Sequence, residues 1–451
     1  TKAVTDRNLA LTLTVNNSNV IREAIVYLKD TQSNLSDTLK VTQYPEPKWK
    51  LNNDKLFAKY DMTELTHSFE CNIPFDVVFD EEVEWVKLKE TKSEDGQFKM
   101  VFELQPNTGE FFNRTKLRLE NEVLGLSFPL SLSQMYKTYD GHTVIWKKPT
   151  YNDPFASVPN FPRITFNFIL IGDGFTKEEI ESGVYDLYCQ EAMEGMESLE
   201  PFKTYSERFG FILLHAESAE SGCTDYNATY GGPKVVDTRF KCSYDEFGTG
   251  MNCDYTAIQE FVKTSIEGAG LDYIPTQDVV IVMANGKRYG GVANLTKSGE
   301  GVAICPVSEE PFPNNFVQIL RHEAGGHAFG KLADEYSFGG PIDASTASYL
   351  KSWQEAGMYL NVSMSSTEFP KPWQELKDRG KISDVYVGGF SCSGGVWRSS
   401  ENSLMKGMDE GFNILSRYLI YLRMKNLRGE GMDFPAASLD DFLSRDKEDT
   451  E

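Results

Sequence analysis

The feature that most constrains this sequence is a pair of histidines placed five residues apart. His322 and His327 are two of only five histidines among the 451 residues, and they bracket Glu323. In an α-helix, residues i and i+5 are about 140° apart around the axis, so both imidazoles cannot face one partner. A π-type turn absorbs one extra residue and restores a common face, and glycine tolerates the backbone distortion. We therefore predict a π-bulge over Ala324 to Gly326.

Two histidines on one helix face, with a glutamate beside the first, are typical of a zinc site. Zinc in such a site takes three protein ligands and keeps one position for water. His322 and His327 would supply two of the three. Gly330 can end the helix with a left-handed turn and bring the acidic pair that follows beneath the metal. We expect Asp334 to be the third ligand and Glu335 to support it through a hydrogen bond or salt bridge, with Glu335 as the alternative ligand.

Glu323 is placed to act as a general base. A carboxylate beside the first metal ligand would take a proton from the attacking water and pass it to the leaving amine of a peptide bond. An edge strand somewhere within Tyr289 to Cys305 would align an extended peptide by backbone pairing. The motif therefore favours hydrolysis of peptide bonds.

The charge of the chain excludes some classes of partner. With 45 Lys and Arg against 67 Asp and Glu, the net charge is −22, which argues against nucleic acid and anionic membrane surfaces. No apolar run approaches the ~20 residues that cross a bilayer, so we expect no transmembrane segment. The seven cysteines form no Cys-x-x-Cys pair, and we expect one disulfide among Cys223, Cys242 and Cys253. Because the sequence begins with Thr1, we expect a mature or trimmed form that export would fit.

The first 140 residues favour an all-β structure. Apolar residues alternate with small or polar ones from Leu9 to Val15, and the same period of two recurs from Phe98 to Leu104. The pattern from Asn16 to Gln43 parallels the pattern from Asn107 to Gln134, which indicates two copies of one small sandwich. We therefore expect a partial β-sandwich repeat over residues 1–44 and a β-sandwich module over residues 45–140.

A change of composition marks the next boundary. Residues 141–162 are rich in proline and predict a linker. Beyond them strands alternate with helices, which predicts an α/β domain over residues 163–430, followed by an acidic C-terminal tail over residues 431–451. The prolines of the linker are Pro149, Pro154, Pro159 and Pro162.

Two local signals within the α/β domain are specific enough to test. Thr176 and Glu179 form a capping box that starts a helix running to about Leu199. The glycine-rich residues 388–395 predict a loop.

Residues from about 160 to 425 resemble the IgA-peptidase family of zinc metallopeptidases, whose motif is His-Glu-x-x-His-x-x-Gly-x-x-x-Asp-Glu. The stretches Ile169 to Thr176 and Pro201 to Phe209 are also similar to this family. The chain departs from the motif by one added glycine between the glutamate and the second histidine. From that histidine onward it matches through His327, Gly330, Asp334 and Glu335.

The resemblance implies a metzincin-like α/β zinc peptidase domain, Zn²⁺ as the cofactor, and protein or glycoprotein substrates. Metzincin peptidases carry a methionine in a tight turn below the zinc ion, and Met405 resembles it. The family name does not establish immunoglobulin A as the substrate of this chain.

The N-terminal part resembles BACON-type β-sandwich modules, which stand at the front of secreted bacterial enzymes. This resemblance implies a secreted or cell-surface protein, such as a lipoprotein. The name of these modules implies carbohydrate binding. The sequence shows no cluster of aromatic residues that would form a sugar platform, so a spacer role is favoured over binding of surface glycans.

Two functional hypotheses follow for this multi-domain chain of β-sandwich modules and an α/β domain. The first is a secreted or surface zinc metalloendopeptidase. The second is a catalytically inactive, peptidase-like module that binds zinc, or a surface glycan or protein. Glu323 favours the first, because an inactive site has no evident need of a general base.

Overall fold

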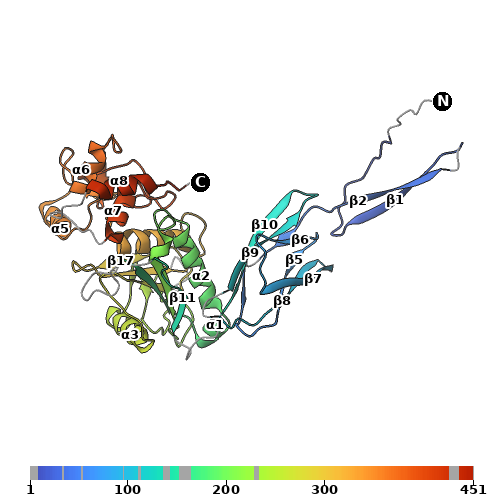
Figure 1. Ribbon diagram of the computed structural model, residues 1–451, viewed down its shortest axis with the longest axis horizontal. Coiled ribbons are helices and arrows are strands. Elements are labelled where there is room, and N and C mark those ends of the chain that lie inside the picture. The colour runs from blue at the N-terminus through green and yellow to red at the C-terminus, as the bar shows by residue number, and fades with distance from the viewer. Residues whose placement is uncertain are drawn as a thin grey trace. The chain divides into compact units, whose positions relative to one another are not determined.

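The computed structural model describes residues 9–32, 35–51, 54–94, 96–109, 113–135, 143–151, 164–227, 233–425 and 436–449. The chain separates into two compact units, Thr1–Lys137 and Thr138–Glu451. The first unit is built of strands and the second of mixed helices and strands, as Figure 1 shows. Within the described residues, no helix combines the length and apolar character needed to cross a membrane. The predicted order, strand-rich first and α/β second, is confirmed.

The first unit contains a β-sandwich. One sheet has the strand order β4-β10-β9-β6 and the other the order β3-β5-β8-β7. Phe98 and Phe102 from one sheet and Leu117 and Leu132 from the other are buried in a shared core. Alternate residues face this core because successive side chains of a strand point to opposite faces of the sheet. The strands are β3 (Trp49–Lys50), β4 (Lys55–Ala58), β5 (Glu64–Cys71), β6 (Asp76–Phe79), β7 (Val86–Glu94), β8 (Gln97–Leu104), β9 (Asn113–Asn121) and β10 (Leu126–Gln134).

A separate hairpin of β1 (Arg22–Lys29) and β2 (Ser36–Gln43) precedes the sandwich and forms its own two-stranded sheet (Figure 1). It shares a local pattern with the β9–β10 hairpin. The Gln43 side chain donates to the Thr14 carbonyl at 2.8 Å, and the Gln134 side chain donates to the Gln105 carbonyl at 3.0 Å.

An asparagine two residues after each of these carbonyls completes the pattern. The Asn16 side chain accepts a hydrogen bond from the Ser18 N–H, and the Asn107 side chain accepts one from the Gly109 N–H. Equivalent Asn and Gln residues of the two sequence stretches therefore make equivalent hydrogen bonds. The two hairpins differ in burial, because Leu28 and Leu39 of the first are 40% and 41% exposed whereas Leu117 and Leu132 of the second are fully buried.

The second unit is organised on a six-stranded sheet with the order β11-β13-β12-β16-β18-β17. Strands β13, β12, β16 and β18 run parallel, and the edge strands β11 and β17 pair antiparallel. The inner strands are continuous apolar runs because both faces of the sheet are covered. Their bounds are β11 (Thr143–Lys147), β12 (Phe166–Asp173), β13 (Phe209–Leu214), β16 (Val279–Ala284), β17 (Val292–Leu295) and β18 (Gly301–Pro306).

Strand β11 lies within residues 141–162, where a linker was expected, so the sheet of the second unit already begins there. Thr150 and Tyr151 also donate backbone hydrogen bonds to the Glu207 carbonyl. Pro149 belongs to this ordered part, whereas Pro154, Pro159 and Pro162 lie outside the described residues. Proline content therefore indicated the boundary region but not its first strand.

Helices pack on this sheet. The predicted capping box is confirmed at α1 (Lys177–Glu181), where Thr176 and Glu179 each bond the backbone of the other. The expected single helix is interrupted at Gly183, whose φ of 86° ends α1 before α2 (Val184–Glu197). α2 packs against α4 (Phe316–Leu320) and the π-helix that follows it (Figure 1). α3 (Tyr255–Gly268) and a 3₁₀ turn, Ser206–Arg208, complete this part of the unit.

The chain after residue 340 adds a smaller layer. The glycine-rich residues 388–395, expected as a loop, form most of an antiparallel hairpin that turns at Phe390 and Ser391, both with positive φ. The expected acidic tail contains α8, whose Phe442 packs on Tyr418 and Tyr421. The elements are α5 (Ala344–Glu355), β19 (Val362–Ser363), α6 (Lys371–Asp378), β20 (Tyr386–Gly389), β21 (Cys392–Arg398), α7 (Ile414–Met424) and α8 (Ala436–Arg445).

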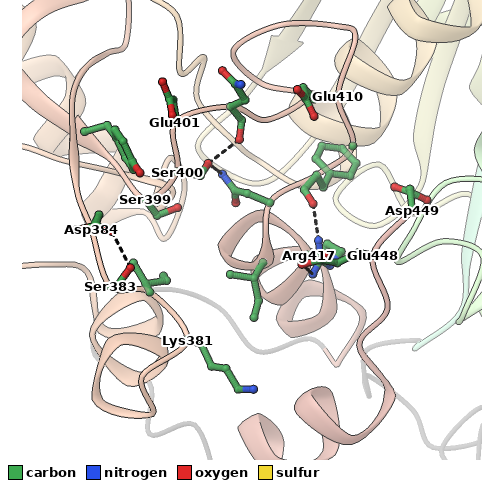
Figure 2. A pocket seen from close by; sticks show the side chains of 17 residues that line it. Lys381, Ser383, Asp384, Ser399, Ser400, Glu401, Glu410, Arg417, Glu448 and Asp449 are labelled. Carbon is green, nitrogen blue, oxygen red and sulfur yellow. Dashed lines mark hydrogen bonds and ion pairs between the residues drawn. The ribbon is translucent and has the colours of Figure 1, made fainter. Parts of the chain in front are cut away.

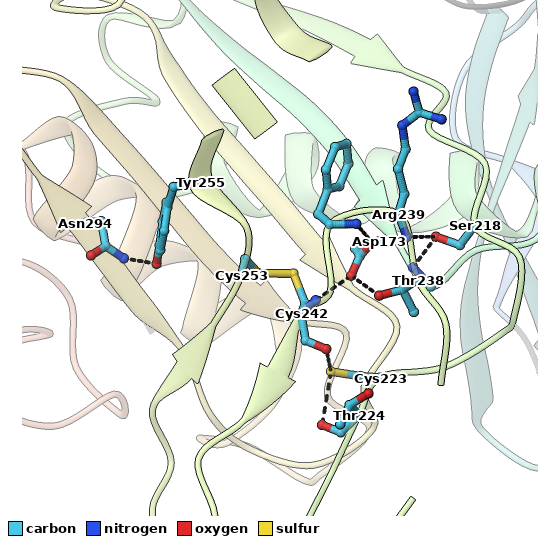
Figure 3. The surroundings of a disulfide bond; sticks show 12 residues. Asp173, Ser218, Cys223, Thr224, Thr238, Arg239, Cys242, Cys253, Tyr255 and Asn294 are labelled. Atoms are coloured by element: carbon cyan, nitrogen blue, oxygen red, sulfur yellow. Dashed lines mark hydrogen bonds between the residues drawn. A yellow bond between two sulfur atoms is a disulfide. The ribbon is translucent and has the colours of Figure 1, made fainter. Parts of the chain in front are cut away.

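A disulfide joins Cys242 to Cys253, which confirms the expected bond and selects one pair of the three cysteines. It lies beside the short hairpin β14 (Ser243–Tyr244) and β15 (Met251–Asn252). Figure 3 shows Asp173, at the end of β12, beneath this loop. Its carboxylate accepts hydrogen bonds from the Thr238 hydroxyl and from the N–H groups of Phe240 and Cys242, so the loop is fastened to the carboxyl end of the central sheet.

Candidate metal centre

The helix that carries both histidines changes its winding between them. α4 starts after Asn315, whose side chain caps the Gln318 N–H, and a π-helix follows over Arg321–Phe329. The predicted π-type distortion is confirmed, and it extends over nine residues instead of a single turn. In this winding i and i+5 share one face.

The two glycines in the π-helix serve close packing. A Cβ at Gly326 would lie 2.3 Å from Met405 Sδ, and one at Gly325 would lie 3.3 Å from Met196 Cε. Neither residue is among those with positive φ. The expectation that glycine supplies unusual backbone angles here is therefore wrong, and the missing side chain is what the site requires.

Three atoms converge on one point beside this helix. His322 Nε2 and His327 Nε2 lie 3.1 Å apart, and each lies 3.1 Å from Asp334 Oδ1. The side chains of His322, His327 and Asp334 are 5%, 13% and 24% exposed, so the protein covers most of their surface. It is the one group of three His, Cys, Asp or Glu ligands within metal-binding reach in the described part of the chain.

The other nitrogen of each imidazole fixes where its proton sits. His322 Nδ1 lies 3.0 Å from the Leu404 carbonyl, and His327 Nδ1 lies 2.7 Å from the Leu332 carbonyl. A carbonyl can only accept, so each Nδ1 carries the proton and each Nε2 of a neutral ring presents a lone pair. Three electron-rich atoms therefore face one another, and a positive charge among them is needed to hold this arrangement.

The cluster fits a metal cation. Ligands about 2.0–2.1 Å from a tetrahedral zinc ion lie about 3.3 Å apart, close to the 3.1 Å observed. In the chain alone a proton can supply the charge. Burial opposes an imidazolium, but the Asp334 carboxylate outweighs it and raises the pKa of His327 to about 9. Burial likewise raises the pKa of Asp334, but the imidazoles dominate and hold it well below its usual range.

The comparisons with known proteins agree with this geometry. The sequence profile described as IgA Peptidase M64 matches residues 156–382, half of the chain. The chain belongs to the IgA peptidase M64 family. M64 is a family of metallopeptidases, so peptide-bond hydrolysis is the chemistry of this class. The suspected family is thereby confirmed. No curated protein matches the chain.

Solved structures resemble it only weakly. A complex of Dpr2 Ig1-Ig2 with DIP-Theta is 12% identical with a TM-score of 0.16, covering 25% of this chain and 41% of that chain. Titin domain M7 is 12% identical with a TM-score of 0.15, covering 20% and 94%. An endo-fucoidan hydrolase of glycoside hydrolase family 107 is 9% identical with a TM-score of 0.15, covering 25% and 22%. This M64 chain thus spans less than half of the first of these, and scores so low carry no inference.

The chain reaches Asp334 by a turn that differs from the expected one. Gly330 keeps a helical φ of −68°, and the left-handed residue is Lys331 with a φ of 56°. A Cβ at Gly330 would lie 2.7 Å from the Gly326 carbonyl oxygen, so this glycine is also required by packing. The Leu332 N–H then closes the turn on the Gly326 carbonyl. The reversal places Asp334 against both imidazoles.

Glu335 faces away from the imidazoles into a separate network. Its carboxylate accepts hydrogen bonds from Ser403 Oγ at 2.6 Å, Asn361 Nδ2 at 3.0 Å and Asn413 Nδ2 at 3.1 Å. The side chain is fully buried, and burial raises its pKa against the effect of these donors. The geometry therefore brings Asp334 to the histidines, while Glu335 takes the expected hydrogen-bonding role without a salt bridge among its described contacts.

A turn at Leu404 and Met405 lies beneath the donor atoms. The Leu404 carbonyl orients His322, the Met405 carbonyl accepts from the Glu335 N–H, and the Met405 side chain is fully buried against Gly326. Met405 therefore connects the π-helix to the segment that carries Glu335.

Glu323 lies beside the cluster and is 8% exposed. Burial raises its pKa, and the two imidazoles act in the opposite direction. Gly291, the residue before edge strand β17, passes directly over it, because a Cβ there would lie 3.0 Å from Glu323 Oε1. The free edge of the sheet and the candidate base are therefore neighbours.

Two tyrosines near the cluster were not found from the sequence. Burial, followed by the charge of Asp334, raises the pKa of Tyr336, and burial with the charges of Glu323 and Asp334 raises the pKa of Tyr289. Both phenols therefore stay protonated beside the site. The position of Tyr336 directly after the acidic pair was the available signal, whereas nothing in the sequence marked Tyr289.

Proposed function

We propose that this M64 chain is a zinc metalloendopeptidase that hydrolyses peptide bonds of protein or glycoprotein substrates. In this proposal His322, His327 and Asp334 hold the metal and Glu323 is the general base. The observation that carries it is the convergence of three donor atoms at 3.1 Å, each with its lone pair directed inward.

The donor set favours zinc as the metal. Two imidazole nitrogens and one carboxylate oxygen are a common ligand set of catalytic zinc, which keeps a further position open. When bound, zinc supplies polarisation of the scissile carbonyl and acidifies water. The π-helix and the Lys331 turn hold the donors in place, and the Leu404 and Leu332 carbonyls fix the orientation of the rings.

Glu323 would move the protons of the reaction. Its carboxylate accepts a proton from the attacking water and delivers it to the amine nitrogen as the peptide bond breaks. Burial raises its pKa, which strengthens it as a base and makes its protonated form a usable acid. Because the residue is nearly buried, few water molecules compete for the proton.

The substrate would lie along strand β17. Among the strands that the structure describes, β17 pairs with β18 alone, so its other edge offers backbone groups to an extended peptide. Gly291 leads into this strand from directly above Glu323, which brings a peptide paired there toward the base. In this proposal, β17 is the edge strand within residues 289–305 that was predicted to align the substrate.

The proposal includes export to the surface or outside of the cell. The Cys242–Cys253 disulfide supports it, because such bonds persist in oxidising compartments. The BACON-like modules and the metzincin-like character of the α/β domain also belong to the proposal, and a spacer role for the N-terminal modules is favoured over glycan binding. The added glycine of the motif is accommodated by the π-helix, which supports the active form over the inactive alternative.

The test compares the wild-type chain with Glu323→Gln in zinc content and in cleavage of a broad peptide library. We expect one zinc per chain in both proteins and a rate about 10²–10⁴-fold lower in the variant. Glu260→Gln, an exposed glutamate on α3, is the matched control and should cleave as the wild type does. If both zinc-loaded proteins fail to cleave any peptide, the inactive module is the correct description.

A further inference from the structure

A second site lies in the C-terminal part of the second unit, away from the metal donors. It is a cavity of about 410 Å³ lined by residues 381–384, 386, 399–402, 410–414, 417 and 448–449. Figure 2 shows Glu401, Glu410 and Asp449 around one side and Lys381 at the other end. We propose that this cavity binds a long basic side chain, lysine or arginine, of a polypeptide.

The charge of the cavity favours a cation. Five carboxylates line it, against the two basic groups of Lys381 and Arg417. Arg417 is already neutralised, because Asp446 receives Nε at 2.7 Å and Nη2 at 2.8 Å. The single positive charge of Lys381 does not balance the negative charge of the five carboxylates. The carboxylates belong to Asp384, Glu401, Glu410, Glu448 and Asp449.

Among the residues that the structure describes, a buried hydroxyl on the wall has no partner. Ser399 is 8% exposed, and its Oγ makes no hydrogen bond to any of those residues. Figure 2 shows this hydroxyl turned inward from the cavity wall. A buried polar group without a partner costs free energy, so a ligand that offers a donor is favoured at this place.

The spacing of the acidic groups argues for an extended cation. No three of these carboxylates fall within metal-binding reach of one another, since the described residues form such a group only at His322, His327 and Asp334. Three apolar side chains also line the cavity: Ile382 and Phe412, which are buried, and Ile414, which is half-buried. Apolar side chains among carboxylates suit a methylene stem that ends in a positive charge.

The cavity is tied to the network behind the metal donors. Asn413, on its wall, donates to Ser400 Oγ at 2.9 Å and to the Glu335 carboxylate at 3.1 Å. A polypeptide substrate held here would be anchored beside the hydrogen bonds of Glu335, the residue directly after Asp334. The binding itself does not depend on peptide cleavage, so it can be tested separately from the proposed function.

The test is a calorimetric titration of the full chain with trilysine amide at low salt, with mass spectrometry confirming that the peptide stays intact. We expect saturable one-to-one binding that high salt weakens. Glu401→Gln with Glu410→Gln should reduce the affinity about fivefold or more. Ser399→Ala should also weaken binding while leaving the melting temperature unchanged. Trilysine amide acetylated on its side chains should not bind, and Glu260→Gln should bind as the wild type does.

Three results would overturn the proposal. The first is no saturable binding by the wild type, and the second is equal affinity of the wild type and the double glutamine variant. The third is tight binding of Ca²⁺ by the wild type that the double variant loses, which would make the cavity a metal site. Melting temperatures of the variants close to that of the wild type show that the comparison is between folded proteins.

Discussion

The metal donors and the Glu335 network are neighbours in the chain, and they surround their carboxylates in opposite ways. Asp334 Oδ1 faces the Nε2 atoms of two imidazoles, which present lone pairs when the rings are neutral, whereas the Glu335 oxygens face a hydroxyl and two amides that donate. The pKa of Asp334 falls well below its usual range, while burial raises that of Glu335. The donor atoms around Asp334 need a positive charge among them, whereas the hydrogen bonds of Glu335 are satisfied by neutral donors.

This contrast indicates that Asp334 is suited to bind a cation and Glu335 to hold chain segments together. A set of lone pairs directed at one point stores the capacity to bind a metal ion. A carboxylate saturated by neutral donors instead holds chain segments together, and Glu335 connects Asn361, Ser403 and Asn413. Consecutive residues can therefore be assigned different tasks, and substitutions at the two positions should have different consequences.

Asp334→Asn should have the largest effect. The amide removes the negative charge that the imidazoles and the metal require, so we expect zinc content to fall well below one per chain and peptidase activity to drop at least about 10³-fold. Metal analysis of the purified variant and its initial rates check this. An Asp334→Asn variant that retained full zinc and activity would remove the distinction between the two carboxylates.

Glu335→Gln should damage stability more than metal content. The new side-chain amide would meet donors where the carboxylate accepted, at a cost of about 1–3 kcal/mol for a mismatched buried polar group. We expect a lower melting temperature with zinc still near one per chain. Loss of zinc at full stability would instead make Glu335 the ligand.

The two glycines of the π-helix offer a matched pair. Gly326→Ala forces a Cβ within 2.3 Å of Met405 Sδ, whereas Gly325→Ala meets its nearest atom at 3.3 Å. Overpacking of this kind costs about 1–3 kcal/mol, so we expect the larger fall in the free energy of unfolding for Gly326→Ala. Urea unfolding of both variants measures it. Equal effects would mean that Met405 does not rest on Gly326.

The metal-free chain should lose stability as the pH rises. His327 has a pKa of about 9 in the folded chain against an ordinary value of 6.5, so its contribution is fully present below pH 6.5 and is lost as the pH rises through 9. Zinc requires unprotonated rings, so the zinc-bound chain should lack this loss. Melting temperatures between pH 6.5 and 9, with chelator and with zinc, compare the two. If the melting temperature changed with pH equally in chelator and in zinc, the raised pKa of His327 in the metal-free chain would be contradicted.

Periodic and short-range signals could be read from the sequence. The i, i+5 spacing of the histidines required a π-type winding, and the capping box at Thr176 depends on residues three apart. The apolar runs predicted the inner strands β12, β13 and β16 because such strands are buried on both faces.

What escaped prediction depends on remote contacts. The role of Gly326 follows from Met405, and the Glu335 network assembles residues from three distant segments. The residues 388–395 form strands despite their glycines, because β21 pairs with both β19 and β20. The left-handed turn falls on Lys331, because Gly330 keeps a helical φ and donates its N–H to the Gly325 carbonyl.

The most direct test of the central claim is anomalous scattering at the zinc edge from crystals of the zinc-loaded chain. The account predicts one peak bounded by His322 Nε2, His327 Nε2 and an Asp334 oxygen, with Glu335 still bonded to Ser403, Asn361 and Asn413. No peak at this place, or a peak that takes Glu335 in place of Asp334, would contradict it.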